Sequence, residues 1–148
     1  MTAITTLDKA KRDESIATLK KHIATLPQRT IDTTHLIYGG MYSRTIFIPA
    51  GTILTGVHIK LNNICIMSGD ITVTTDAGVI RLTGYHVIPA KSGLSRIGIS
   101  HADTHWTTLF PTELDDVAQI EDSMSDESAS LSSRLHSKDC NKYIKVEG

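Results

Sequence analysis

The sequence predicts an all-β fold, in which a closed or nearly closed antiparallel sheet forms a jelly roll or barrel. β-Branched residues recur throughout residues 41–110, and turn residues interrupt them every five to ten positions. No helical pattern separates the expected strands, which argues against a parallel sheet. With 148 residues, 40% of them hydrophobic, the chain is long enough for one such domain with flanking arms.

A helix is predicted before the β region, over residues 7–26. Its apolar residues recur at spacings of three and four and form one stripe, which consists of Ile16, Leu19, Ile23 and Leu26. Pro27 ends the pattern. Two interpretations stay open for this arm, residues 1–34: the stripe packs on the chain's own barrel, or it packs against a neighbouring subunit or a partner protein.

The β region, residues 35–111, is predicted to consist of short strands. They lie near residues 35–38, 42–48, 52–59, 63–67, 70–75, 78–82, 85–88, 94–99 and 104–110. Turn signals such as those at residues 49–51 and 76–78 separate them. Ile71 and Val73 alternate with threonines, which indicates one buried and one solvated face.

A serine-rich, acidic arm is predicted after the barrel, over residues 112–148. Thr112 is expected to cap a short helix over residues 113–122. Residues 123–142 are expected to be a mobile tail or linker, unless a partner surface orders them. Residues 143–146, YIKV, are expected to add a strand to an exposed sheet edge, for instance on a neighbouring subunit.

The charge and hydropathy of the chain argue against two classes of partner. A formal net charge of −1 gives no electrostatic basis for binding nucleic acid. No apolar run approaches the ~20 residues that a membrane-spanning helix needs, and the first 25 residues lack the apolar core of a secretory signal. The two cysteines, Cys65 in an apolar strand and Cys140 in the polar tail, are expected to stay unpaired, as suits a reduced intracellular setting.

Histidines are the first candidates for a metal site, because imidazoles and a carboxylate on neighbouring barrel strands can converge on one ion. Four histidines of the β region are considered, His58, His86, His101 and His105, and the candidate ligands among them are His58, His101 and His105. Lys60 shares the strand parity of His58, so both are expected to face outward, and no Glu occurs between residues 15 and 112. The spacing of the other two histidines around Asp103 could chelate a metal, but a local turn hydrogen bond explains Asp103 more simply. We therefore expect no bound metal and no cofactor.

Other catalytic arrangements are not indicated. The sequence has no G-x-S-x-G elbow and no phosphate-binding glycine loop, so no catalytic residue is assigned. Lys60, Lys91 and Arg96 could form a small basic patch, although scattered solvated charges are the simpler interpretation. Trp106 is interpreted as a core or subunit-interface anchor, and it could also stack on a sugar.

Three runs of sequence resemble one known family. They are GGMYSRTIFIPAGTILTGVHI, NNICIMSGDITVTTDAGVIRL and VIPAKSGLSRIGISHADTHWTTLFPTELDDVAQIE, which together cover roughly residues 38–121. Their order and spacing resemble small cupin-like proteins of tailed bacteriophages and prophages. The matching positions are Tyr42, Arg44, Ile48, Pro49, Ala50, Gly51, Gly56, His58, Gly69, Pro89, Ala90, Arg96, Gly98, Asp103, Thr104, Trp106, Thr107, Thr108 and Asp115. The chain departs from the family at Lys60, Asn62 and Asn63, where the family often carries histidines, and at Thr75, where it carries an acid.

The resemblance implies a cupin barrel and a viral origin. We therefore expect a non-enzymatic structural component of a tailed-phage virion, a head, neck or tail accessory or attachment protein made in the host cytoplasm. It is expected to form homo-oligomers and to contact other virion proteins through its barrel and arms. The candidate interface residues are Ile16, Leu19, Ile23, Leu26, Trp106, Tyr143 and Ile144. The alternatives are a metal-dependent cupin enzyme and a small-molecule or glycan-binding protein.

Overall fold

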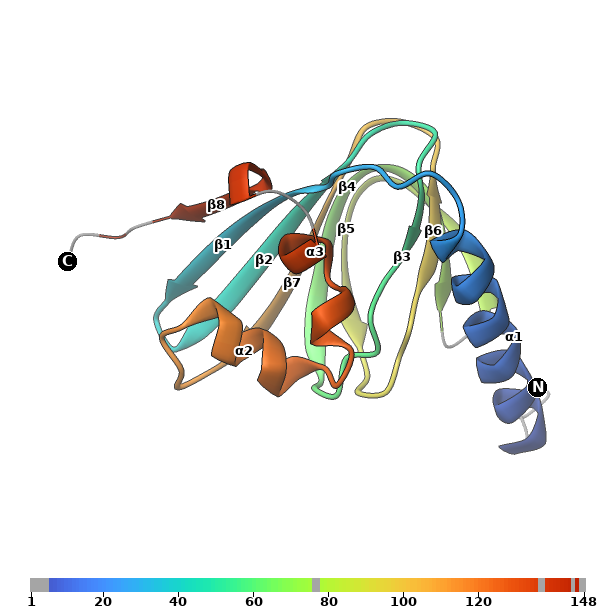
Figure 1. The fold of residues 1–148 in the computed structure, drawn as a ribbon, viewed down its shortest axis with the longest axis horizontal. Coiled ribbons are helices and arrows are strands. Elements are labelled where there is room, and N and C mark those ends of the chain that lie inside the picture. Colours follow the sequence, from blue (N-terminus) through green and yellow to red (C-terminus); the bar gives the residue numbers. More distant parts are fainter. Residues whose placement is uncertain (1–5, 76–77, 136–137, 145, 147–148) are drawn as a thin grey trace.

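The computed structural model describes residues 6–75, 78–135, 138–144 and 146. It confirms the predicted all-β fold, since the strands form one curled sheet with few helices around it (Figure 1). The strands are β1 (Asp32–Tyr38), β2 (Met41–Ile48), β3 (Ile53–Thr55), β4 (Asn63–Thr75), β5 (Gly78–Ala90), β6 (Ile97–Ser100), β7 (Thr104–Pro111) and β8 (Asn141–Ile144). The helices are α1 (Thr6–Ala24), α2 (Val117–Met124) and α3 (Ser132–Leu135), with short 3-10 turns at Ser128–Ser130 and Lys138–Cys140.

Strand β4 organises the sheet because three other strands pair with it. β5 pairs antiparallel with β4 along its whole length. On the other side of β4, β7 pairs with residues 64–68 and β6 with residues 71–73, so the sheet forks between them. One branch continues as β7-β2-β1-β8 and the other as β6-β3. The fork lets one sheet curl around a common interior (Figure 1).

Gly69 and Gly84 form the bend at this fork. They are direct partners in the β4–β5 pairing, and their φ angles are +146° and +86°, which side chains rarely adopt. β7 also approaches Gly69 closely, since a Cβ there would lie 2.7 Å from Thr104 Cα and 2.8 Å from the Asp103 carbonyl oxygen. Glycine is therefore needed at position 69 both for backbone conformation and for space.

The predicted strand boundaries were wrong at these two glycines. Residues 63–67 and 70–75 belong to one strand of 13 residues, β4, and residues 78–82 and 85–88 belong to another, β5. A glycine can bend a strand as well as end it, and the sequence pattern does not distinguish the two outcomes. β3 and β6 are shorter than predicted, and β1 begins earlier, at Asp32.

Alternate strand residues point into the curled sheet and form two buried clusters. The first consists of Ile48, Cys65, Met67, Ile71, Val73, Leu82, Ala90 and Trp106. The second consists of Tyr42, Phe110, Ile120, Met124 and Leu131. Because the second cluster combines side chains of β2 and β7 with side chains of α2, it holds the C-terminal segment against the sheet.

The short C-terminal helix begins later than predicted. α2 starts at Val117, and its N-cap is Asp116, whose carboxylate accepts a 2.9 Å hydrogen bond from the Gln119 backbone N–H. The hydroxyl of Thr112, the predicted cap, instead accepts from the Leu114 backbone N–H and closes a local turn.

The prediction of a mobile tail was wrong for the described part of residues 123–142. The Glu121 carboxylate is buried, and it accepts hydrogen bonds from Ser133 at 2.7 Å and from Arg134 at 3.0 Å. β8 then pairs parallel with β1 of the same chain. The chain's own barrel, rather than a partner, orders this serine-rich segment, because it supplies both a buried cluster and a free strand edge.

Helix α1 is confirmed at the predicted place and lies beside the β3 and β6 side of the sheet (Figure 1). Its apolar stripe is only partly covered. Ile16 and Ile23 are half-buried, whereas Leu19 is 44% and Leu26 is 41% exposed. The stripe therefore packs on its own sheet and still leaves apolar surface exposed.

Candidate functional site

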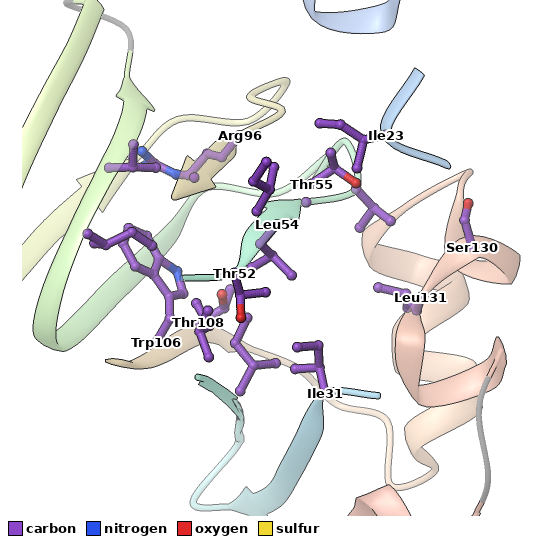
Figure 2. Close-up of a pocket in the computed structure, with 18 of the residues that line it drawn as sticks. Ile23, Ile31, Thr52, Leu54, Thr55, Arg96, Trp106, Thr108, Ser130 and Leu131 are labelled. Carbon is purple, nitrogen blue, oxygen red and sulfur yellow. The ribbon is translucent and has the colours of Figure 1, made fainter. Parts of the chain in front are cut away.

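A cavity of about 530 Å³ lies inside the curl of the sheet. Its walls come from both branches of the sheet, from the end of α1 and from the segment that follows α2. Figure 2 shows Arg96 and Trp106 together on one wall, with Ser130 and Leu131 on the opposite wall. Aliphatic side chains such as Leu54 form most of the lining. A largely apolar cavity with a few polar groups is the usual form of a small-molecule site.

Arg96 is the most distinctive polar group in this cavity. Its guanidinium carbon lies 5.4 Å from the centre of the Trp106 ring, which is cation–π distance. One guanidinium N–H donates to the Thr74 carbonyl oxygen at 3.1 Å. The backbone of Arg96 is held in turn, because its carbonyl oxygen accepts from the Gly56 N–H at 2.8 Å. The structure thus fixes where this cation points.

Cys65 lies on the same wall but is unsuited to nucleophilic chemistry. Burial raises the pKa of its thiol, and Sγ donates a 3.2 Å hydrogen bond to the Asn63 side-chain oxygen. A protonated, buried thiol is a poor nucleophile. The structure confirms Cys65 as a core residue and shows that Cys140 is buried as well; both thiols are free.

Arg29 contributes a second cation to the lining. Its guanidinium donates to the Thr52 hydroxyl at 3.0 Å, next to Ile23 and Leu26 of the α1 end. These residues join the N-terminal arm to the cavity. Three of the predicted interface residues, Ile23, Leu26 and Trp106, therefore form part of the cavity wall.

A fully paired polar cluster lies beside the cavity, under α2 and α3. Arg44 donates to Glu121 at 2.8 Å and to Ser133 at 3.1 Å, and Arg134 donates to the other Glu121 oxygen. Within the described residues, no buried side-chain nitrogen or oxygen lacks a hydrogen-bond partner. Because the polar groups of this cluster are paired with one another, we interpret its role as structural.

His35 and Tyr42 belong to this closed cluster. His35 Nδ1 lies 2.7 Å from the Tyr42 hydroxyl, and Nε2 lies 2.8 Å from Asn141 Oδ1. Burial lowers the pKa of His35 and raises the pKa of Tyr42 to about 12. The neutral imidazole satisfies both contacts, with Nε2–H as the donor to Asn141.

The predicted metal candidates do not come together. His58 is exposed with Lys60, as predicted, and its backbone N–H donates to Glu127. His101 contacts the Thr72 hydroxyl at 2.7 Å, and the ring of His105 packs at 5.1 Å on Phe47. Across the described residues, no three His, Cys, Asp or Glu side chains are grouped as a metal site requires.

Asp103 makes a long-range hydrogen bond instead of the local turn bond that was predicted. Its carboxylate accepts from the Ala50 backbone N–H at 2.9 Å, 53 residues away in the chain, and so fixes the turn after β2. Lys60 and Lys91 are exposed, as predicted for solvated charges, whereas Arg96 is not. Lys60 pairs with Asp126 at 2.8 Å, Lys91 is exposed, and Arg96 points into the cavity.

The predicted interface residues occupy three different environments. Trp106 is 8% exposed and belongs to the core, so it is no surface anchor in this chain. Tyr143 stacks on His35 at 4.9 Å yet remains 58% exposed. Ile144, which is 51% exposed, pairs with Leu36 at the sheet edge.

The outward side of the sheet carries a broad surface that sequence reasoning missed. The strand register aligns two rows of outward residues across β5, β4, β7, β2 and β1, and we call them the outer face. They are Val87, Ile66, Thr107, Thr45 and Thr34 in one row, and Pro89, Ile64, Leu109, Ser43 and Leu36 in the next. These ten residues include no Lys, Arg, Asp or Glu. Ile144 extends the second row, and Lys142 borders the first.

No sequence signal indicated the inward direction of Arg96. The apolar residues Ile97 and Ile99 have the opposite parity, and Arg96 itself lies just before β6. The outer face had no sequence signal either, because its rows align only when the register of five strands is known.

Comparisons with known proteins find a distant likeness to solved structures. No family model matches the sequence, and no curated relative matches it. A cupin-superfamily protein from Desulfitobacterium hafniense is 11% identical and covers 61% of this chain and 86% of its own, with a TM-score of 0.48. The Cnp3 cupin domain from Schizosaccharomyces pombe is 18% identical over 61% of this chain and 66% of its own, with a TM-score of 0.46. An RmlC-like cupin from Methanocaldococcus jannaschii is 11% identical over 57% and 83%, also with a TM-score of 0.46.

The chain has an all-β fold in which one sheet curls around a cavity. Within its described part, no helix has the length and hydrophobicity that are needed to cross a membrane.

Proposed function

We propose that this cupin-like protein is a non-enzymatic structural component of a tailed-phage virion that acts through subunit–subunit contacts. The viral assignment rests on the sequence resemblance over residues 38–121. The observation that carries the contact role is the outer face, ten outward residues across five strands with no Lys, Arg, Asp or Glu. One-sided antiparallel sheets normally place polar and charged residues on their outward side.

A second copy of this chain is the partner that best fits the outer face. A neutral surface is complementary to itself, and depletion of charge is typical of interface centres. Ile64 is 45% and Val87 is 55% exposed, so both have apolar area left to bury. Two sheets that stack face to face about a two-fold axis would bury both rows of each copy.

The exposed parts of the arms extend the same proposal. Apolar surface remains exposed after the arms have packed on the barrel, at Leu19 on α1, at Leu26 just after α1, and at Tyr143 and Ile144 on β8. Ile144 continues a row of the outer face, whereas α1 lies on the opposite side of the molecule from β8 (Figure 1). The α1 surface is thus available to other virion proteins while the outer face joins two copies.

The contact role is tested by the molar mass of the full chain in solution, measured by light scattering. We expect an oligomer for the unmodified chain and a monomer for Val87→Asp, because a charge would be buried without a partner. Val79→Asp is the matched control, since Val79 lies on the same strand with the same parity and is 69% exposed, but lies outside the outer face. A monomeric unmodified chain, or equal effects of the two variants, would contradict the role of the outer face.

The viral assignment has its own test. Mass spectrometry of purified particles from the phage whose genome encodes this chain should find it at a fixed copy number. Its absence from intact particles would refute a structural role in the virion even if the chain forms dimers.

A further inference from the structure

We propose that the cavity inside the curled sheet binds a small organic carboxylate, whose charged group pairs with Arg96 and whose apolar body fills the space beside Trp106. This inference goes beyond the structural role, and either one can fail without the other. It rests on the charge balance of the cavity wall, on the contacts of Arg96 and on the chemistry of the remaining lining.

The charged side chains that line the cavity are all of one sign. Arg29, Arg44 and Arg96 contribute to the described lining, and no Asp or Glu does. Only Arg44 is neutralised, by the 2.8 Å ion pair with Glu121. An excess of positive charge in a chain of net charge −1 indicates that the cavity favours an anion.

Arg96 has no ion-pair partner among the described residues. Its contacts are the Trp106 ring, the Thr74 carbonyl oxygen and the neighbourhood of the Cys65 thiol. A guanidinium carries five N–H donors, so most of them remain for a ligand. A cation held against apolar walls without a counter-charge is costly, and a bound anion would remove that cost.

The shape of the guanidinium and the nature of the walls favour a carboxylate over an inorganic anion. The planar fork of donors matches the two oxygens of a carboxylate. The neighbouring lining, which includes Ile46, Leu54 and Val73, offers little to the hydration shell of a phosphate. It suits an aliphatic or aromatic body, and 530 Å³ lies within the range of ordinary small-molecule sites.

Other residues of the wall fit the same ligand class. The Trp106 ring lies next to Arg96, so an apolar body that follows the carboxylate meets an aromatic surface (Figure 2). Arg29 at the α1 side of the cavity attracts an approaching anion. Thr108 and Asn63 supply hydroxyl and amide groups for a ligand that carries a further polar substituent.

Trp106 makes the test direct, because it is the single tryptophan of the chain. We would titrate the full-length protein with 4-phenylbutyrate, with its neutral analogue 4-phenylbutanol and with inorganic phosphate. Tryptophan fluorescence and calorimetry provide two independent readouts. We expect saturable binding of the carboxylate, and affinities at least tenfold weaker for the alcohol and for phosphate, because hydrogen bonds to a charged group are lost or the apolar walls stay empty.

The variants Arg96→Met and Arg96→Lys identify the residue that binds the charge. Arg96→Met should weaken 4-phenylbutyrate about tenfold or more and leave 4-phenylbutanol unchanged, and Arg96→Lys should lie between it and the unmodified protein. Arg81→Met is the matched control, because Arg81 is exposed and pairs with Asp70 away from the cavity. Circular dichroism verifies folding of each variant.

Three results would overturn the inference. The first is no saturable binding of the carboxylate to the unmodified protein. The second is equal affinity for the acid and the alcohol, or for the acid and phosphate. The third is an unchanged carboxylate affinity in both folded Arg96 variants.

Discussion

Two arginines of the barrel interior, Arg44 and Arg96, are held in opposite ways. Arg44 donates to the buried Glu121 and to Ser133, so its charge joins β2 to the C-terminal segment. Arg96 rests on an aromatic ring and a backbone carbonyl and faces a cavity. The difference teaches that a buried cation with a carboxylate partner serves the fold, whereas a cation without one is available to a ligand.

The largest effect on the free energy of unfolding is expected when the same substitution is made at Arg44 and at Arg96. Arg44→Met leaves part of the buried Glu121 charge unpaired, so we expect a loss of about 3 kcal/mol or more in the free energy of unfolding. Arg96→Met removes no ion pair, so we expect a change within about 1 kcal/mol. Urea unfolding followed by circular dichroism measures both values. Equal losses in the free energy of unfolding would contradict this difference, because Arg96 would then stabilise the fold as much as Arg44 does.

The next effect concerns the bend at which the two branches of the sheet meet. Gly69→Ala places a Cβ against the backbone of β7 at a φ of +146°, so we expect a loss of about 2–3 kcal/mol in the free energy of unfolding. Gly84→Ala shares the positive φ but meets nothing within 4 Å, so a loss of about 1 kcal/mol is expected. Thermal and urea unfolding of the two variants would show whether the close approach of β7, rather than the bend alone, requires glycine. An equal cost for both would show that the approach is irrelevant.

The smallest expected effect is a pH dependence in the paired cluster. Burial lowers the pKa of His35 below its usual 6.5, so the folded protein holds the neutral ring. Below that value the unfolded chain binds more protons than the folded chain at this site. The stabilisation is therefore complete above pH 6.5 and is lost as the pH falls through the folded-state pKa.

The measurement is the free energy of unfolding at several pH values below and above neutrality. His35→Gln should be less stable at neutral pH but should lose less stability on acidification than the unmodified chain. His101→Gln is the control, because His101 is exposed. Parallel pH profiles for the unmodified chain and His35→Gln would show that His35 does not govern the acid response.

Much of the fold could be predicted because local patterns carry it. Ile71 and Val73 alternate with threonines, and both are buried as that alternation predicts. The apolar spacing and Pro27 located α1 to within a few residues. The same local reasoning failed at Gly69 and Gly84, where a bend and a turn have the same residue signature.

The candidate site was less predictable, because it depends on contacts between distant segments. His58, His101 and His105 were considered for their chemistry, but they face different neighbours. Arg96 was considered only as part of a surface patch, because its contacts with Trp106 and Thr74 join distant segments. The serine-rich tail looked mobile because nothing local indicates that Glu121 binds it.

The sequence by itself determined the strand-rich fold, the N-terminal helix and the outward position of His58, since each depends on periodicity or on neighbouring residues. Only the tertiary structure decided that the tail packs on its own barrel, that charge-free rows align on the outer face and that Arg96 faces a cavity without a carboxylate partner. Periodicity acts over a few residues, whereas ion pairing, strand register and burial depend on segments that are separated in the chain by dozens of positions.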